Sequence, residues 1–296
     1  MHDLPDFLQA RADAPVLVHP PQGSPLPLVC DSPHSGTAYP EDFGVALPLA
    51  LLRRGEDSLV DQLWQDWPAH GATLIAATFP RTYIDPNREV DDLNPQMLDG
   101  PWPTPLQPGA KTLQGLGLVW EKISQAGQAT PIYDRKLSVA EVQQRIDRYW
   151  QPYHAALAQA IRWSVDRFGG VWHLNLHSMP SDVYQRLGTP DKHLADFVLG
   201  DRDGSSSDPA FTHFVGECLR ARGYSVAYNE PYKGVALLGR IGQPHLQRHS
   251  VQIEINRRIY LNEDTREPNA HCAQLQQDLQ AVMPEIAGFV RQAMRA

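Results

Sequence analysis

Cysteine is scarce in this 296-residue chain, and its scarcity narrows the chemistry that the protein can perform. The three cysteines, Cys30, Cys218 and Cys272, form no C-x-x-C pair. An odd and scattered set of this kind excludes a disulfide framework and a cysteine-based zinc knuckle. Any metal bound by this chain is therefore held by histidine and carboxylate side chains.

Basic charge and long apolar runs are also lacking. The chain has 26 basic and 34 acidic side chains, a formal net charge of -8 and a pI of about 5.8. This balance excludes a generic nucleic-acid-binding protein, because binding to a polyanion depends on a basic surface. No apolar run approaches the ~20 residues of a membrane span. The first fifteen residues lack a basic segment followed by an apolar core, so we predict no signal peptide and a cytoplasmic location.

Proline and histidine are abundant, with 26 and 12 residues, whereas the hydrophobic fraction of 42% is that of an ordinary globular protein. The richest proline and glycine stretch runs from residue 94 to 131, and apolar residues recur within it. We interpret this stretch as an ordered excursion rather than a linker. No internal repeat interrupts the chain, so residues 1–296 are predicted to form one large domain.

Strand and helix patterns alternate along the sequence and predict an α/β fold with helices on both faces of a sheet. The expected strands are residues 27–30, 72–78, 171–176, 224–228 and 250–255, and the expected helices are residues 47–67, 138–168, 209–222 and 268–295, the last split at Pro284. A capping box, Ser138 with Glu141, begins the second helix. Polar residues follow all five strands, and we expect them at one edge of the sheet, where active sites of such folds lie.

Two histidines that follow or end apolar strands, His34 and His177, suit Zn²⁺ if they converge. The alternative is that each merely caps its strand through a backbone carbonyl. A catalytic zinc takes three protein ligands, and the third candidate is Glu56, Asp57 or Asp61 on the first helix. We favour Asp57, with Asp61 four residues on along the same helix face.

Glu254 lies in an apolar strand, where a carboxylate is costly unless it is used. It is either a general base for a metal-activated water or the partner of Arg257 or Arg258 in a salt bridge. Arg81 and Arg88 suggest a small anionic substrate, because guanidinium groups bind carboxylates in a bidentate manner. The alternative is internal pairing, of Arg88 with Asp85 or Glu89.

Three further residues are weaker candidates. His249 and Arg240 are candidates to stabilise the oxyanion of the reaction, although both also suit a surface loop. Lys233 lies in a loop bounded by glycine and proline that could close over the site, or it belongs to an exposed hairpin.

Seven motifs in order, spanning roughly residues 25 to 262, resemble the N-formylglutamate amidohydrolase family: PHSG, EDSLVDQL, RTYIDPNRE, LHSMP, GDRDG, NEPYKG and QIEINRRIY. The resemblance implies a zinc-dependent hydrolase with a single-domain three-layer α/β sandwich and a mixed, mostly parallel sheet. This fold is phosphorylase/hydrolase-like and related to the zinc exopeptidases. Motif by motif, it implies His34, Asp57 and His177 as metal ligands and Glu254 as the catalytic carboxylate. Arg81, Asn87 and Arg88 would hold substrate carboxylates.

The activity implied by the resemblance is release of formate from N-formyl-L-glutamate in histidine degradation. The late loop reads EPYKGV where dedicated deformylases carry RFKGG, which places the chain in a broader subgroup. The alternatives are a hydrolase of another N-acyl amino acid or a cell-wall peptide, and a non-catalytic carboxylate-binding protein. A serine hydrolase is disfavoured because the chain has no G-x-S-x-G motif. The expected partner is a small anionic N-acyl amino acid, with no nucleic acid and no membrane.

Overall fold

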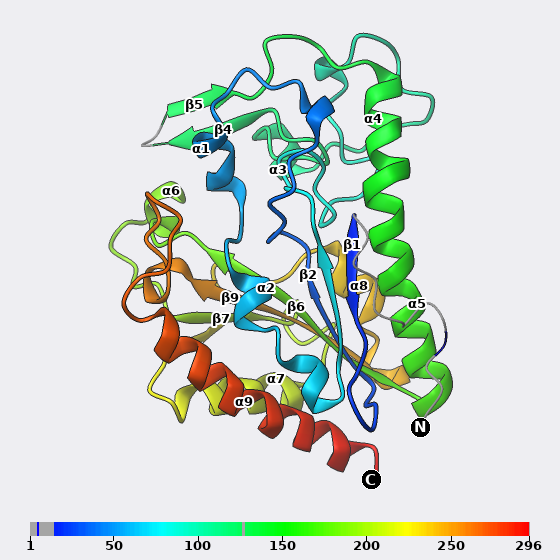
Figure 1. Cartoon of the computed structure of the whole chain (residues 1–296), viewed down its shortest axis with the longest axis vertical. Coiled ribbons are helices and arrows are strands. Elements are labelled where there is room, and N and C mark those ends of the chain that lie inside the picture. The colour runs from blue at the N-terminus through cyan, green and yellow to red at the C-terminus, as the bar shows by residue number, and fades with distance from the viewer. Residues whose placement is uncertain (1–4, 6–14, 126–127, 296) are drawn as a thin grey trace.

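Seven strands form the central sheet of the protein, described here from a computed structural model (Figure 1). The structure describes residue 5 and residues 15–125 and 128–295, so most of the N-terminal segment in which no signal peptide was predicted lies outside the described residues. The sheet has the order β1-β3-β2-β6-β9-β7-β8. Its strands are β1 (Val16–His19), β2 (Leu28–Ser32), β3 (Thr73–Ala77), β6 (Val171–Met179), β7 (Phe197–Gly200), β8 (Val226–Tyr228) and β9 (Arg248–Asn256).

The sheet is mixed and mostly parallel, as predicted. Strands β3, β2, β6 and β9 run parallel, while β1 pairs antiparallel with β3 and β7 pairs antiparallel with β9. Because β8 is parallel to β7, it also runs against the central four strands. The end of β8 therefore lies at the opposite edge, so the expectation that all five strands end at one edge is wrong, although the loop after β8 turns back and Tyr232 packs against Met179 and Tyr184. Only the four central strands share a carboxyl edge.

Helices cover both faces of the sheet, which confirms the expected layers. One core packs α7 (Pro209–Arg220) and α9 (Cys272–Ala293) against Leu28, Cys30 and the apolar face of β9. The other core packs α5 (Gln151–Phe168) against Val29 and Ile75. Successive residues of β2 thus face opposite layers, as strand geometry requires. Figure 1 shows α5 along one side of the sheet and α7 and α9 on the other.

The helix expected over residues 47–67 is broken into pieces. Its parts are α1 (Leu49–Leu52), a 3₁₀ turn (Arg53–Gly55), α2 (Val60–Leu63) and a further 3₁₀ turn (Trp67–His70). Leu59 has a φ of 67°, in the left-handed region that interrupts a helix. The expectation that Asp57 and Asp61 share one helix face is therefore wrong. The break leaves residues 56–59 free to reach the sheet.

Among the other helix predictions, the capping box at Ser138 is confirmed and the split at Pro284 is wrong. The capping box at Ser138 is present, with Ser138 and Glu141 exchanging both hydrogen bonds at the start of α4 (Val139–Arg145). A π-helical segment (Ile146–Trp150) then joins α4 to α5. The expected split at Pro284 is wrong, because Pro284 lies inside continuous α9, whose buried apolar face holds the helix against the sheet.

The excursion from residue 94 to 131 is ordered where the structure describes it. It contains a 3₁₀ turn (Pro95–Met97), α3 (Ala110–Leu113) and a hairpin of β4 (Lys122–Gln125) and β5 (Gln128–Pro131). The remaining elements are the 3₁₀ turns Glu41–Phe43, Pro244–Leu246 and Arg257–Ile259 and the short helices α6 (Val183–Arg186) and α8 (Ala236–Ile241). Among the described elements, no helix combines the length and apolar character needed to cross a membrane.

Candidate active site

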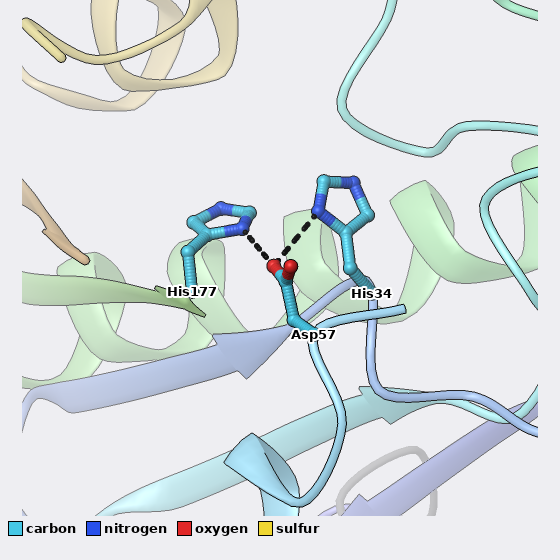
Figure 2. Close-up of side chains that lie close together, drawn as sticks. All are labelled: His34, Asp57 and His177. Atoms are coloured by element: carbon cyan, nitrogen blue, oxygen red, sulfur yellow. Dashed lines mark hydrogen bonds and ion pairs between the residues drawn. The ribbon is translucent and has the colours of Figure 1, made fainter. Parts of the chain in front are cut away.

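Three buried side chains from distant parts of the sequence converge at the carboxyl edge of the sheet (Figure 2). His34 follows β2, Asp57 lies in the break before α2, and His177 lies near the end of β6. Their ligand atoms all lie within 4.8 Å of one another. Asp57 Oδ2 is 3.3 Å from His34 Nδ1 and 3.1 Å from His177 Nδ1.

The broken helix places Asp57, rather than its acidic neighbours, in this cluster. The Asp57 backbone amide donates to the His34 carbonyl at 3.0 Å, which ties the break to the turn after β2. Glu56 instead accepts hydrogen bonds from Tyr39, Arg53 and Ser58. Asp61 lies on α2 outside the cluster. Of the three candidate third ligands, Asp57 alone faces both histidines.

Hydrogen bonds behind the histidines fix which ring nitrogen faces Asp57. His34 Nε2 lies 2.8 Å from Asp85 Oδ1, a carboxylate oxygen that can only accept, so Nε2 carries the proton. His177 Nε2 lies 2.6 Å from Asn175 Oδ1, and Asn175 is held in this orientation because its Nδ2 donates to Asp31 Oδ1. In the neutral form of each ring, Nδ1 therefore presents a lone pair to Asp57.

A network of buried hydrogen bonds reaches His177 through Asn175. Asp31 accepts hydrogen bonds from Asn175, His173 and Tyr153, and His173 also bonds Ser250. His173, Asn175 and His177 alternate along β6 and so lie on one face of the strand. This network holds the Asn175 side chain in place and so orients the ring of His177.

The three converging atoms fit a metal cation. Two imidazole lone pairs and a carboxylate oxygen repel one another at these distances unless a proton or a cation lies between them. The second Asp57 oxygen is occupied, because Arg257 Nη2 donates to Oδ1 at 2.8 Å. Burial alone would raise the pKa of Asp57, but His177 and His34, which hydrogen-bond to it when a proton rather than a metal lies between them, and the charge of Arg257 hold that pKa well below its usual value. Asp57 is therefore ionised, as a metal ligand must be.

Glu254 lies beside this cluster and forms no ion pair among the described residues. It is the register partner of His177 on β9, and Gln252 Nε2 donates to it at 2.7 Å. Arg257 pairs with Asp57 and Arg258 with Asp196, so among the described residues neither forms the salt bridge weighed for Glu254. Burial and, to a lesser degree, the Asp57 charge raise the pKa of Glu254 to about 7, although His177 and Arg81 oppose the shift.

The loop after β3 holds the two candidate substrate arginines. Arg81, rather than Arg88, pairs with Asp85, donating from Nε and Nη2 to Oδ2, and stacks over Trp120; its Nη1 makes no hydrogen bond among the described residues. Arg88 donates only to the carbonyls of Leu116 and Asn87 and has no carboxylate partner among the described residues. The side-chain amide of Asn87 lies 3.0 Å from His177 Nε2, which places this loop against the cluster; turning the amide so that Oδ1 faces the Nε2 proton also gives a partner to Oδ1, which otherwise has none among the described residues.

His249 lies away from the cluster, and the role expected for it is contradicted. It precedes Glu254 by five residues on β9, roughly 16 Å along a strand. An odd separation also turns its side chain to the opposite face, where it stacks on Trp172 in the core beneath α7 and α9. Its Nδ1 accepts from the Asp208 amide.

Arg240 and Lys233 are surface residues engaged in ion pairs. Arg240 on α8 pairs with Glu89 at 2.7 Å, next to Arg88 along the chain. Lys233 pairs with Asp203 at 2.8 Å, and both side chains are more than 60% exposed. The structure brings neither into contact with the three converging residues.

Sequence reasoning missed three residues that hold the cluster in place. Asp85 was considered only as a partner for an arginine, Arg257 only as a partner for Glu254, and Asn175 was not considered. The alternation His173, Asn175, His177 in one strand was the available signal, because three polar residues on one face of an otherwise apolar strand need partners.

Two histidines and a carboxylate converge beside Glu254 at the ends of parallel strands, and this arrangement defines the class: a hydrolase of α/β fold with a candidate metal site. Comparison with known proteins gives the family. The model of the N-formylglutamate amidohydrolase family matches residues 26–261, so the chain belongs to this family, whose members hydrolyse an amide C–N bond. The resemblance noted in the sequence is thereby confirmed.

Relatives support the same assignment. The crystal structure of an N-formylglutamate amidohydrolase from Ralstonia eutropha JMP134 is 56% identical, with a TM-score of 0.92 over 95% of this chain and 100% of that one. An N-formylglutamate deformylase of Pseudomonas aeruginosa is 29% identical and covers 88% of this chain and 91% of its own. A gene product of Agrobacterium tumefaciens, 19% identical with a TM-score of 0.62 over 93% of this chain and 94% of its own, shares the fold.

Proposed function

We propose that this protein is a zinc-dependent deformylase that hydrolyses N-formyl-L-glutamate to formate and L-glutamate. The observation that carries the proposal is the buried convergence of His34, Asp57 and His177 beside Glu254, which has no ion-pair partner among the described residues. Family membership supports the choice of an amide bond as the target. The Pseudomonas aeruginosa and Ralstonia eutropha relatives support the choice of substrate.

Zinc is the metal that this donor set favours. Two neutral imidazoles and one carboxylate form a three-ligand set that leaves a position open, whereas Mg²⁺ and Ca²⁺ prefer oxygen ligands alone. When bound, zinc supplies a Lewis acid that polarises a carbonyl group and makes water more acidic. Asp85 and Asn175 hold the two imidazole rings by their outer nitrogens, as metal-binding histidines require.

Glu254 is the proton carrier of the proposed reaction. With its pKa raised to about 7, it can accept a proton from the attacking water and return it at neutral pH. Water oxygen bonds to the formyl carbon, the C–N bond breaks, and Glu254 passes the proton to the leaving amine nitrogen. Arg81 and Arg88 bind the substrate carboxylates and so hold the formyl group in place.

The direct test measures zinc content alongside formate release from N-formyl-L-glutamate. We expect His177→Ala to lose both bound zinc and turnover while circular dichroism shows a folded protein. Retained zinc with continuing turnover in this variant would show that the site lies elsewhere.

The second test separates the metal from the proton carrier. Glu254→Gln is expected to keep its zinc and to lose several orders of magnitude in kcat, since an amide cannot accept the proton. Glu217→Gln, an exposed change on α7, is the matched control and is expected to retain full activity. A panel of N-formyl, N-acetyl and N-succinyl amino acids then distinguishes a deformylase from a hydrolase of other N-acyl amino acids.

A further inference from the structure

Lys111 is a cation that sequence reasoning did not single out and that the structure brings to the substrate arginines. It lies on α3, within the proline-rich excursion, where the residue is exposed to solvent but flanked closely enough by protein to be partly desolvated. In Figure 1, α3 lies beyond the carboxyl ends of the central strands, on the side of the candidate active site. The excursion therefore contributes to the site as well as covering the fold.

Backbone hydrogen bonds fix α3 against the loop that carries Arg88. The Leu116 amide donates to the Lys111 carbonyl at 2.9 Å, and Arg88 Nε donates to the Leu116 carbonyl at 3.0 Å. One residue thus bridges Lys111 and Arg88. Asp92, four residues beyond Arg88, accepts from the Gly109 amide at 2.7 Å and from the Thr112 hydroxyl, which anchors both ends of α3.

Neither cation forms an ion pair among the described residues, although the charges of Asp85 and Asp92 act on Arg88. Among the described residues, the Lys111 ammonium has no hydrogen bond or ion pair, and Arg88 donates only to carbonyls. Burial and the charges of Arg88 and Arg81 lower the pKa of Lys111, and the Glu254 charge opposes this shift. Like charges in one partly buried place are unfavourable unless an anion binds there.

We propose that Lys111 and Arg88 bind the side-chain carboxylate of a dicarboxylic N-acyl amino acid, and that Lys111 makes the enzyme selective for acidic over neutral side chains. The inference rests on the proposed function and identifies the side-chain carboxylate as the group that the site recognises. Arg81 takes the other carboxylate, because its charge acts directly on Glu254. The α-carboxylate lies nearest the scissile nitrogen, and the side-chain carboxylate lies two methylene groups further away.

Substitution of Lys111 tests the inference with two substrates of nearly equal shape, N-formyl-L-glutamate and N-formyl-L-glutamine. In Lys111→Met we expect kcat/KM for the glutamate substrate to fall roughly tenfold to hundredfold, the range of one charge-assisted hydrogen bond, mainly through KM. The value for the glutamine substrate is expected to stay within about twofold. Lys111→Arg should restore most of the selectivity.

Lys136→Met removes the same charge from an exposed lysine and is the matched control. An equal loss with both substrates, or no loss with the glutamate substrate, would overturn the inference.

Binding of the amino acid product gives an answer that does not depend on turnover. Isothermal titration is expected to show L-glutamate binding more tightly than L-glutamine to the wild-type chain, with the difference lost in Lys111→Met. If no formate is released by the wild type, the proposed function fails, and this titration still decides the role of Lys111. L-glutamate binding that is absent, or that is unchanged in Lys111→Met, would refute it.

Discussion

Asp57 divides its two carboxylate oxygens between two tasks. Oδ2 faces His34 and His177, while Oδ1 accepts from Arg257 at 2.8 Å. The guanidinium of Arg257 also donates to the Glu56 carbonyl and to Ser178, so it fixes the broken segment before α2 against β6. One buried cation thereby positions the carboxylate and leaves a single oxygen for a metal.

Asp85 positions the ring of His34 by accepting a hydrogen bond from Nε2, and substitution of Asp85 tests that role. In Asp85→Asn the amide cannot accept from both His34 and the donors Arg81 and Trp120 that share the carboxylate. We expect the affinity for zinc to fall roughly tenfold to hundredfold, the usual cost of removing such a support. Competition with a chromogenic chelator measures the affinity.

Asp99→Asn, an exposed change, serves as the control for Asp85→Asn and should bind zinc as the wild type does. If Asp85→Asn folds normally and binds zinc equally tightly, the proton on His34 Nε2 is not what orients the ring.

From the sequence, individual residues of the candidate site could be predicted where they lie in, or shortly after, an apolar strand. His34, His177 and Glu254 were chosen because each interrupts or ends an apolar strand, and the structure brings them together. His249 was a candidate because it precedes Glu254 by five residues, but it faces the opposite layer, because an odd separation along β9 reverses the side chain. Counting the parity of positions would have excluded it.

At the scale of elements, the π-helical segment and the first turn of α5 each present one donor to the loop after β3 that carries Arg81 and Arg88. Trp150 Nε1 donates to the Arg88 carbonyl at 2.9 Å, and His154 Nε2 donates to the Pro86 carbonyl at 2.8 Å. The two rings are packed together, with centroids 3.8 Å apart. A local widening of a helix near a functional site is a common use of π segments.

Trp150→Phe should loosen this loop without removing any substrate contact. Loss of the hydrogen bond to the Arg88 carbonyl is expected to cost about 1 kcal/mol of stability. We also expect KM for the anionic substrate to rise severalfold while kcat changes little, because Arg88 is less well placed. Chemical denaturation and steady-state kinetics measure the two effects.

Trp163→Phe, a change on the same helix where the ring packs on Phe168, is the matched control. A rise in KM of equal size in this control would mean that Trp150 acts through general stability.

His154 gives α5 a defined dependence on pH. Burial and, secondly, the charge of Arg240 lower its pKa to about 4, below the ordinary value near 6.5. The unfolded chain therefore binds a proton at this residue between pH 6.5 and 4 while the folded chain does not, so stability falls as the pH is lowered through this range. The loss is on the order of 1–3 kcal/mol.

Substitution isolates the contribution of His154. In His154→Gln the free energy of unfolding should fall less steeply from pH 6.5 to 4 than in the wild type, as measured by urea denaturation at each pH. His245→Gln, an exposed histidine, should leave the wild-type slope unchanged. Parallel curves for His154→Gln and the wild type would contradict the assignment.

The elements that the sequence could not predict are those set by contacts between distant segments. Helix propensity over residues 47–67 favours a continuous helix, but the chain breaks at Leu59 so that Asp57 can reach His34. The direction of β8 depends on its pairing with β7, a short strand that the apolar patterns did not reveal. Both errors arise because tertiary packing outweighs local preference.

At the scale of the whole molecule, net charge and site charge have opposite signs. The chain carries a formal charge of -8, yet Arg81, Arg88 and Lys111 gather at the loop after β3. The acidic surplus argues against binding to extended polyanions, while the local cations favour a small anion. The sequence composition thus excluded a class of partner without excluding the charge of the substrate.

Metal binding is expected to stabilise the whole fold, because His34, Asp57 and His177 come from segments up to 143 positions apart, counting from residue 34 to residue 177. Zinc held only by the folded state at a hundred times its Kd adds about 2.7 kcal/mol, which corresponds to a rise in Tm of roughly 5 °C for a chain of this size. Scanning calorimetry of chelator-treated protein with and without added zinc measures this difference. Calcium should give no shift, since it prefers an all-oxygen site. An equal zinc-induced rise in His177→Ala would show that the stabilising metal binds somewhere other than at these three residues.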